Sequence, residues 1–311
     1  MVSELPYPDS DVAVGSDNGS ANRPLVSVIM AMRDSADTIA NAVRSIQWQT
    51  LEDWELIVID DGSSDASASI VRALNDSRIR LVCEATGAGL ATRLNQAVAL
   101  ARADYIARMD ADDICFPERL ARQLARLRQE PKLDLLGCGA VVFAEDAQLR
   151  GELTVGLTQQ EITARPFRGF PLPHPTWCGR AEWFRSNPYD ARLMKTQDQD
   201  LLLRTFGHSR FAALDDVLIG YRQDALDLAK MLLGRRIFIG SLWRYAWRSG
   251  ESLQALAGIG MQFLKSGVDI ATIGLGLNRL MQRSRLKPVR PAVIMQWQDL
   301  QRRLALAGTA R

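Results

Sequence analysis

The residues best suited to chemistry are three aspartates within four positions, in Asp110-Ala111-Asp112-Asp113. They follow residues 105–109, a short run that is typical of a buried strand. Carboxylates this close repel one another, which disfavours ionisation unless a cation is present. A hard divalent ion such as Mg²⁺ or Mn²⁺ prefers oxygen ligands and offsets the charge that develops on a diphosphate leaving group. The cluster suggests a metal site, although a solvated acidic turn would contain the same residues.

A second acidic group lies in Asp60-Asp61-Gly62-Ser63-Ser64-Asp65, directly after another predicted strand. A carboxylate there can accept a hydrogen bond from the imide N–H of a uracil or from a ribose hydroxyl. Turn formation and helix capping are the alternative; they explain Asp65 well but leave Asp60 and Asp61 unexplained.

A third acidic group is Asp198 and Asp200, in a segment with helical spacing. Residues i and i+2 of a helix point to different sides, so one carboxylate can face a crevice while the other pairs locally. A carboxylate that faces an acceptor hydroxyl is a candidate general base. A capping pair at a helix start is the alternative.

Strand-like runs and helical spacing alternate along the first half of the chain. We expect strands at 25–30, 55–59, 79–82, 105–109 and 135–143, and helices at 37–49, 65–74, 89–102 and about 117–128. This alternation is typical of parallel βαβ units with right-handed crossovers, whose ligands bind beyond the carboxyl ends of the strands. The fold class is therefore α/β, with a single, mostly parallel, twisted sheet flanked by helices.

The chain divides into three parts. Residues 1–23 are rich in Asp, Ser, Asn, Pro and Gly and are predicted to be a disordered lead-in. Residues 24–224 form the main domain, in which 151–224 is less regular because prolines precede His174. Residues 225–311 are predicted to be a basic, helical C-terminal segment.

That C-terminal segment contains 14 Lys and Arg against four Asp and Glu, although the whole chain has a net charge of only +2. It is suited to meeting an anionic surface, either a membrane or a polyanionic acceptor, with Trp243 and Trp247 at headgroup level. A solvated helical face and a helical cap packed on the main domain are the alternatives. We do not expect a membrane-spanning helix, because Lys265 and Asp269 interrupt the most apolar stretch.

The composition is that of an ordinary globular protein, with 47% hydrophobic and 24% charged residues. Four cysteines without a C-x-x-C pair and only two histidines argue against a zinc site. The first residues lack a basic start followed by an apolar run, so we expect a cytoplasmic protein with free, mostly buried thiols.

Taken together, the motifs resemble the family 2 glycosyltransferases of the GT-A fold, in order and spacing, over about residues 25–222. The motifs are Val26-Ser27-Val28-Ile29-Met30, Ser45-Ile46-Gln47-Trp48-Gln49-Thr50, Glu55 to Asp65, Gly89-Leu90-Ala91, Leu94-Asn95, Tyr105 to Asp113, Pro117-Glu118-Arg119-Leu120, His174-Pro175-Thr176, Asp198-Gln199-Asp200-Leu201 and Val217-Leu218-Ile219-Gly220-Tyr221-Arg222. No single motif is specific, but the ensemble is.

The resemblance implies a nucleotide-sugar donor, UDP-sugar being favoured, and a Mn²⁺ or Mg²⁺ cofactor. Its implied nucleotide-binding residues are Ala31, Arg33, Asp61, Asn95 and Asp110. The family usually has Pro-x-Tyr-Asn after the first strand, whereas this chain has Ala31-Met32-Arg33-Asp34. A stacking tyrosine is therefore absent there, and the Arg33 guanidinium plane can replace it.

For the chemistry, the resemblance implies that Asp110 and Asp112 form the D-x-D motif, with Asp112 the closest metal ligand. Asp198 would be the catalytic base that deprotonates the acceptor hydroxyl, with inversion at the anomeric carbon, and His174 would lie on the acceptor side. The residue before the base is Gln197 where the family usually has Glu. The acceptor would be a saccharide or lipid-linked saccharide of surface polysaccharide or glycolipid synthesis, at the inner face of the cell membrane.

Three other classes of protein compete with this interpretation. A dinucleotide-binding dehydrogenase would need glycines after the first strand, and a nucleotidyltransferase a Gly-rich basic loop there; neither pattern occurs. Nothing suggests a nucleic-acid partner. A non-catalytic GT-A domain that binds a nucleotide-sugar or a protein partner stays the main alternative.

Overall fold

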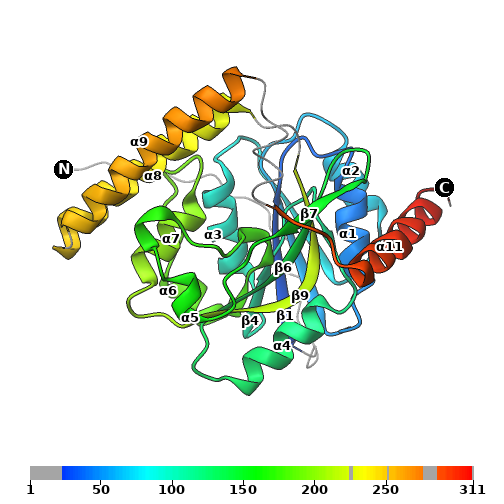
Figure 1. Ribbon diagram of the computed structural model, residues 1–311. Helices are drawn as coiled ribbons and strands as arrows, with labels where there is room; N and C mark the ends of the chain where they lie inside the picture. The colour runs from blue at the N-terminus through cyan, green and yellow to red at the C-terminus, as the bar shows by residue number, and fades with distance from the viewer. Residues whose placement is uncertain (1–22, 224–226, 251, 276–285, 310–311) are drawn as a thin grey trace, which may run out of the picture.

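The computed structural model describes residues 23–223, 227–250, 252–275 and 286–309. The predicted disordered lead-in therefore lies outside the described residues except for Arg23, as does the predicted domain boundary at 224/225. The described chain is a mixed α/β fold in which one curled sheet is covered by helices on both faces (Figure 1).

Within the described residues the sheet has ten strands, of which eight form the order β10-β7-β6-β8-β4-β1-β2-β3, while β9 pairs with β6 and β5. The strands are β1 (Val26–Met32), β2 (Trp54–Asp60), β3 (Ile79–Cys83), β4 (Tyr105–Arg108), β5 (Ile114–Cys115), β6 (Leu135–Phe143), β7 (Leu149–Leu153), β8 (Cys178–Arg180), β9 (Phe211–Arg222) and β10 (Leu286–Lys287). The five strands expected from sequence are β1, β2, β3, β4 and β6.

The N-terminal half of the sheet is parallel, as expected, since β1 pairs in parallel with both β2 and β4, and β2 with β3. The other half is mixed: β8 is antiparallel to β4 and β6, whereas β9 is parallel to β6. All pairings within the βαβ half are thus parallel, whereas the half built from 135–222 combines parallel and antiparallel pairings. The least regular stretch of the sequence contains β9, the longest strand.

The helices cover two faces of the sheet, and residues of β1 alternate between the two cores. Val28 and Met30 pack with α1, α2 and α4, whereas Ile29 packs with α3, α6 and α7. The helices of the main domain are α1 (Ile39–Gln47), α2 (Ser67–Ala73), α3 (Leu90–Leu100), α4 (Arg119–Gln129), α5 (Gln159–Ile162), α6 (Ala181–Ser186) and α7 (Gln197–Thr205), with short 3₁₀ turns η1 (Pro166–Arg168) and η2 (His174–Thr176).

One capping prediction is wrong in detail, because the N-cap of α2 is Ala66 and not Asp65. The Asp65 carboxylate instead accepts from the backbone N–H of Ser67, at 2.9 Å, and from the N–H of Ala36, at 2.9 Å. Asp65 therefore ties the start of α2 to the loop after β1. The four cysteines are free thiols, three of them buried, as expected.

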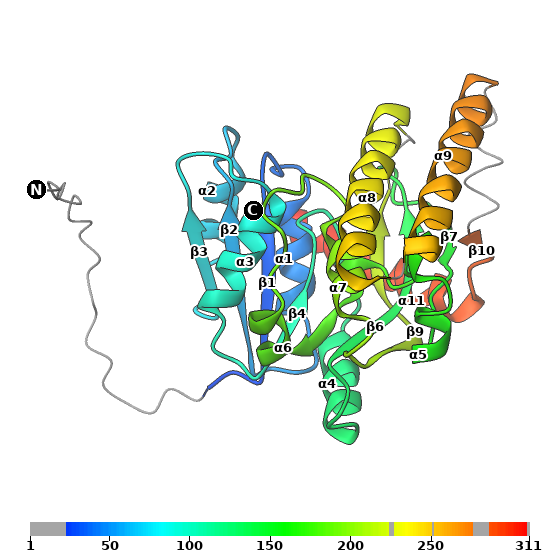
Figure 2. The same ribbon diagram turned by 90° about the vertical axis from the view of Figure 1, so that its left-hand side faces the viewer.

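The C-terminal segment is helical, as predicted, and contains α8 (Leu228–Ser249), α9 (Ser252–Gly274) and α11 (Pro291–Thr309). Helices α8 and α9 lie side by side along the flank that carries α7, whereas α11 packs on the opposite flank (Figures 1 and 2). Trp297 of α11 is buried against Phe143 and Gly220. Within the described residues, no helix combines the length and apolarity that crossing a bilayer requires.

Candidate active site

The acidic cluster lies just beyond the end of β4, a strand in the interior of the sheet next to β1. Carboxylate oxygens of Asp110, Asp112 and Asp113 lie within 4.8 Å of one another. Arg222, the last residue of β9, is hydrogen-bonded to this cluster. Its backbone N–H donates to Asp113 Oδ1 at 2.8 Å, and its Nε donates to the Asp112 carbonyl at 3.2 Å. Segments more than 100 residues apart in sequence therefore build one site.

The pKa values of Asp112 and Asp113 indicate that the cluster carries more negative charge than its surroundings compensate. Burial, reinforced by the charge of Asp110, raises the pKa of Asp112 to about 6. Burial also raises the pKa of Asp113 well above its usual range, and both neighbouring aspartates add to the shift. The buried Oδ2 of Asp113 has no hydrogen-bond partner among the residues that the structure describes. An oxygen-only donor set with an unpaired buried oxygen fits a hard divalent cation such as Mg²⁺ or Mn²⁺.

Asp110 has a second task that sequence reasoning missed. The buried guanidinium of Arg108, on β4, donates to both carboxylate oxygens of Asp110, with Nη1 to Oδ2 at 2.6 Å. Because the Arg108 guanidinium engages both carboxylate oxygens of Asp110, Asp112 is the freer carboxylate of the D-x-D motif. An arginine on a buried strand beside three acids is the signal that could have revealed Arg108.

The expected nucleotide side is assembled at the neighbouring strand ends of β1 and β2. Ala31 pairs in register with Ile59, one strand away, and Arg33 packs against Gly87, where a Cβ would clash with its guanidinium. Asp61 is buried and accepts from the N–H groups of Ala88 and Gly89, at 2.7 and 2.9 Å. Ala31, Arg33 and Asp61 therefore do come together.

The carboxylate of Asp61 is already well satisfied, because Arg93 Nε also donates to it at 2.6 Å. Burial alone would raise the pKa of Asp61, but the hydrogen bonds from Ala88, Arg93 and Gly89 outweigh burial and lower it. Asp61 is thus a fixed anion that shapes the loop at 86–89, and a base contact would add to these bonds.

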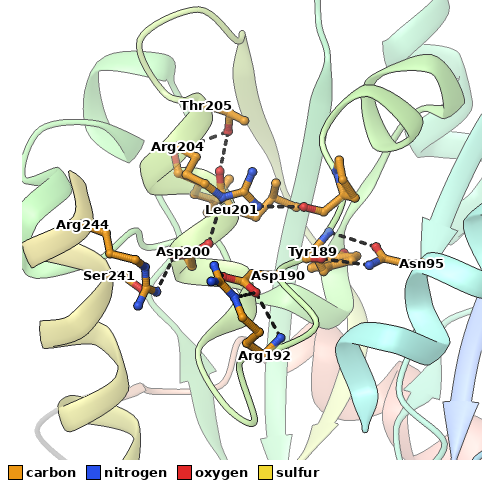
Figure 3. A network of polar contacts seen from close by, with 12 residues as sticks. Asn95, Tyr189, Asp190, Arg192, Asp200, Leu201, Arg204, Thr205, Ser241 and Arg244 are labelled. Atoms are coloured by element: carbon orange, nitrogen blue, oxygen red, sulfur yellow. Dashed lines mark hydrogen bonds and ion pairs between the residues drawn. The ribbon is translucent and has the colours of Figure 1, made fainter. Parts of the chain in front are cut away.

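Asn95 has a different place from the one expected of a nucleotide-binding residue. Its side-chain amide donates to the Tyr189 carbonyl and accepts from the Tyr189 N–H, both at 2.9 Å (Figure 3). Both ends of the amide are therefore engaged by one backbone unit. This geometry indicates that Asn95 holds the segment containing Tyr189 against α3.

Tyr189 is the hydrogen-bond partner of His174, the residue predicted for the acceptor side. Its hydroxyl is 2.8 Å from Nε2 of His174, which is buried and packs edge-on against Trp177. The charges of Asp198 and Asp110 both act on Tyr189, while burial is the main reason that its pKa is raised. His174 is kept neutral, because burial and the charge of Arg108 lower its pKa well below the usual range. The buried His174 therefore orients the Tyr189 hydroxyl.

Asp198 lies in the first turn of α7 and lines a cavity of about 580 Å³ between α7, α8 and α9. Burial raises its pKa, against hydrogen bonds from Gln199 and the charge of Arg108, which act to lower it. A carboxylate with a raised pKa at the edge of a cavity is suited to accept a proton.

Asp200, two residues further on, has the local pairing that sequence suggested for one of the two acids. It is buried and accepts from Arg204 at 2.9 Å and from Arg244 of α8 at 3.4 Å (Figure 3). Asp200 therefore fastens α8 to α7, while Asp198 faces the cavity.

This architecture, a parallel βαβ half with an acidic D-x-D turn at the end of β4, is the GT-A fold of glycosyltransferases. Two solved structures share it: TarS of S. aureus in complex with UDP-GlcNAc, with a TM-score of 0.60, and the mannosyltransferase PcManGT of Pyrobaculum calidifontis in complex with GDP-Man and Mn²⁺, with a TM-score of 0.55. They are 17% and 18% identical to this chain, over 83% and 93% of it and over 78% and 87% of their own chains.

Sequence comparison agrees. The family model described as Glycosyl transferase family 2 matches residues 27–188. EpsE of Bacillus subtilis (strain 168), named as a glycosyltransferase, is 34% identical over 209 residues, covering 65% of this chain and 74% of EpsE. WfgD of Escherichia coli, named as a UDP-Glc:α-D-GlcNAc-diphosphoundecaprenol β-1,3-glucosyltransferase, is 37% identical over 103 residues, covering 33% of this chain and 41% of WfgD. The chain belongs to glycosyl transferase family 2 and is a glycosyltransferase.

Proposed function

We propose that this glycosyltransferase moves a sugar from a nucleotide-sugar, a UDP-sugar being favoured, to an acceptor hydroxyl with inversion at the anomeric carbon. The observation that supports the proposal is the presence of two separate carboxylate sites, the acidic cluster at 110–113 and Asp198 at the edge of the cavity between α7, α8 and α9. The acidic cluster at 110–113 suits a metal-bound diphosphate, and Asp198 with its raised pKa suits a base.

In this proposal Asp198 accepts the proton of the acceptor hydroxyl as that oxygen forms a bond to the anomeric carbon. The bond from the anomeric carbon to the diphosphate breaks on the opposite face, which inverts the configuration. Asp112, with Asp110 and Asp113 beside it, would hold Mn²⁺ or Mg²⁺; the ion would supply charge compensation for the leaving diphosphate. Tyr189 and His174, which are packed and hydrogen-bonded to each other, would support this side of the site as a neutral pair.

The donor proposal rests on the relatives. TarS and PcManGT are described in complex with UDP-GlcNAc and with GDP-Man and Mn²⁺, and WfgD is named for UDP-Glc and a diphosphoundecaprenol-linked acceptor. Further relatives are named for polysaccharide synthesis, such as the succinoglycan biosynthesis protein ExoU of Rhizobium meliloti (strain 1021), 41% identical over 103 residues. We propose a saccharide or lipid-linked saccharide acceptor in surface polysaccharide synthesis, at the cytoplasmic face of the membrane.

The test is a panel of UDP-, GDP- and dTDP-sugars, with and without Mn²⁺, in a thermal-shift assay on the full chain. A donor that binds the folded protein raises its apparent melting temperature. Release of nucleoside diphosphate from the stabilising donor is then measured for wild type and Asp198→Asn. If both are equally inactive with every donor, catalysis is refuted and a non-catalytic nucleotide-sugar-binding domain is supported.

A further inference from the structure

Helix α9 has an inverted distribution of polar and apolar side chains. A helix on the surface of a protein in water buries its apolar side chains and exposes polar ones. In α9 the side chains of Gln262 and Asp269 are buried, with exposed fractions of 3% and 1%. Leu253, Phe263 and Leu264 are 84%, 63% and 62% exposed. Its outer surface is therefore composed for an apolar environment.

The buried polar groups are satisfied between the two helices of the hairpin, which we define as α8 plus α9. Arg235 of α8 donates through Nε to Asp269 at 2.6 Å and through Nη1 to Gln262 at 3.2 Å. Charge and amide thus meet their partners inside the hairpin, and water is not needed to solvate them. Polar contacts between helices combined with apolar outer surfaces are a pattern of helices that meet lipid.

The exposed apolar side chains of the described residues are concentrated here. Nine of the 15 large ones lie on the hairpin: Leu233, Trp243, Trp247, Leu253, Leu256, Phe263, Leu264, Val268 and Ile270. On α8 the exposed positions 233, 236, 243 and 247 recur at multiples of a helical turn, so they share one face. Exposed apolar side chains concentrated on two adjacent helices point to a docking surface.

Charge decides which partner suits this surface. Helix α8 contains five Lys and Arg and no Asp or Glu, and the exposed Trp243 and Trp247 are each followed by an arginine. A second copy of the chain would bring an equally basic helix against the first, which like-charge repulsion disfavours. Arg235 and Arg244 are paired with Asp269 and Asp200, whereas Arg236 and Arg248 are exposed. Exposed tryptophan and arginine on one helix suit the headgroup level of an anionic bilayer, where the ring enters the interface and the cation meets lipid phosphate.

The other face of the hairpin is fixed to the catalytic domain. Gly258 of α9 lies so close to Phe167 that a Cβ there would be 2.6 Å from the Phe167 Cβ, and Phe238 and Leu242 of α8 are buried in the core that also contains α7. The hairpin therefore lies along the domain with one face outward and is not a detached arm (Figures 1 and 2).

We propose that the α8–α9 hairpin docks this protein on an anionic lipid bilayer, with its apolar outer face in the interfacial layer. This inference goes beyond glycosyl transfer and does not depend on it. The cavity that contains Asp198 is lined on its other side by α8 and α9 residues, among them Met231 and Lys265. Docking therefore places that cavity beside the bilayer surface, which suits the lipid-linked acceptor of the proposed function.

The experiment is sedimentation of the full chain with phosphatidylcholine vesicles that contain or lack phosphatidylglycerol. We expect binding to the anionic vesicles and its decline as salt rises. Two double variants should each bind about tenfold more weakly: Trp243→Ser/Trp247→Ser and Arg236→Gln/Arg248→Gln. The first loses both interfacial tryptophans, and the second loses two lipid-facing cations. The matched control, Met295→Ser/Arg302→Gln on α11, removes exposed side chains of the same kinds and should bind like wild type.

Two results would overturn the proposal: no binding of wild type to anionic vesicles, or an equal loss in the α11 control. Light scattering after size exclusion tests whether a second copy of the chain covers the hairpin instead. If wild type is a dimer that does not bind vesicles, and the tryptophan variant is a monomer, the hairpin is a self-association surface. Quenching of wild-type tryptophan fluorescence by brominated lipid gives a measurement that needs no variant. Nucleoside diphosphate release from a soluble donor should be unchanged in all these variants, so failure of docking and failure of catalysis are distinguishable.

Discussion

Two aspartates two residues apart on α7 should respond in opposite ways to the same substitution. Asp198 is half-buried, lines the cavity and accepts only from Gln199, at 3.2 Å, among the side chains of the described residues. Asp200 is buried and carries the ion pairs to Arg204 and Arg244. Changing each aspartate to asparagine keeps the shape of the side chain and removes its charge. The two variants therefore distinguish a loss of catalysis from a loss of stability.

Removal of a general base lowers the rate by about 10²–10⁴-fold, which corresponds to about 3–5 kcal/mol of transition-state stabilisation. Asp198→Asn should therefore lose nucleoside diphosphate release by that factor while folding at least as stably as wild type. Asp200→Asn loses hydrogen bonds to charged groups worth about 1.5–3 kcal/mol. For a chain of this size its melting temperature should fall by about 2–5 °C, with a smaller loss of activity.

The pH dependence of Asp198 follows from its raised pKa. A base acts when deprotonated, so kcat/KM should rise with pH along a limb that lies above the ordinary aspartate range near pH 4. The folded state holds this proton more tightly than the unfolded chain does. Stability is therefore lost as pH rises from the unfolded pKa to the folded pKa, and the gain from Asp198→Asn should appear above that interval and vanish below it.

Three measurements check the pair: initial rates of nucleoside diphosphate release against pH, thermal melts of both variants at several pH values, and donor binding by calorimetry. The reasoning fails if Asp198→Asn keeps wild-type activity, or if Asp200→Asn loses activity as steeply while its melting temperature is unchanged.

Three further predictions concern the metal, the hydrogen-bonded pair Tyr189 and His174, and the C-terminal helix α11. Asp112→Asn, or chelation of the metal, should lower activity by about 10²-fold or more, since the metal contributes several kcal/mol to transition-state stabilisation. Added Mn²⁺ should restore the activity of the chelated wild type but not that of the variant. Equal wild-type activity with and without EDTA would contradict the metal site. Tyr189→Phe should cost about 1–2 kcal/mol in urea unfolding, because buried His174 loses its partner; an unchanged unfolding midpoint would show that the contact is unimportant. Trp297→Ala should cost about 3–5 kcal/mol in the same assay, as the ring fills the space between α11 and Phe143, whereas an effect under about 1 kcal/mol would mean that α11 is only loosely attached.

The βαβ half could be predicted because its signals are local. Each strand from β1 to β4 is a short apolar run, and each intervening helix has its own periodicity, so the parallel order and the acidic strand ends follow from neighbouring residues. The mixed half could not, because β9 pairs with β6, more than 70 residues earlier, and is interrupted by Asp215 and Asp216, which break its strand pattern. Its register depends on which sheet edge is free, and no local pattern encodes that.

The candidate site divides in the same way. Sequence by itself determined the residue types: an oxygen-rich D-x-D turn, a buried strand-end Asp61 and an acid pair on one helix, since composition and spacing fix which ligands and protons they can hold. Tertiary structure decided which partner each of these side chains binds. Arg108 occupies Asp110, Tyr189 engages Asn95 and His174, and Arg244 claims Asp200 and leaves Asp198 to face the cavity. Those partners are 2 to 94 residues away, and only the folded chain brings the charges close enough to choose between them.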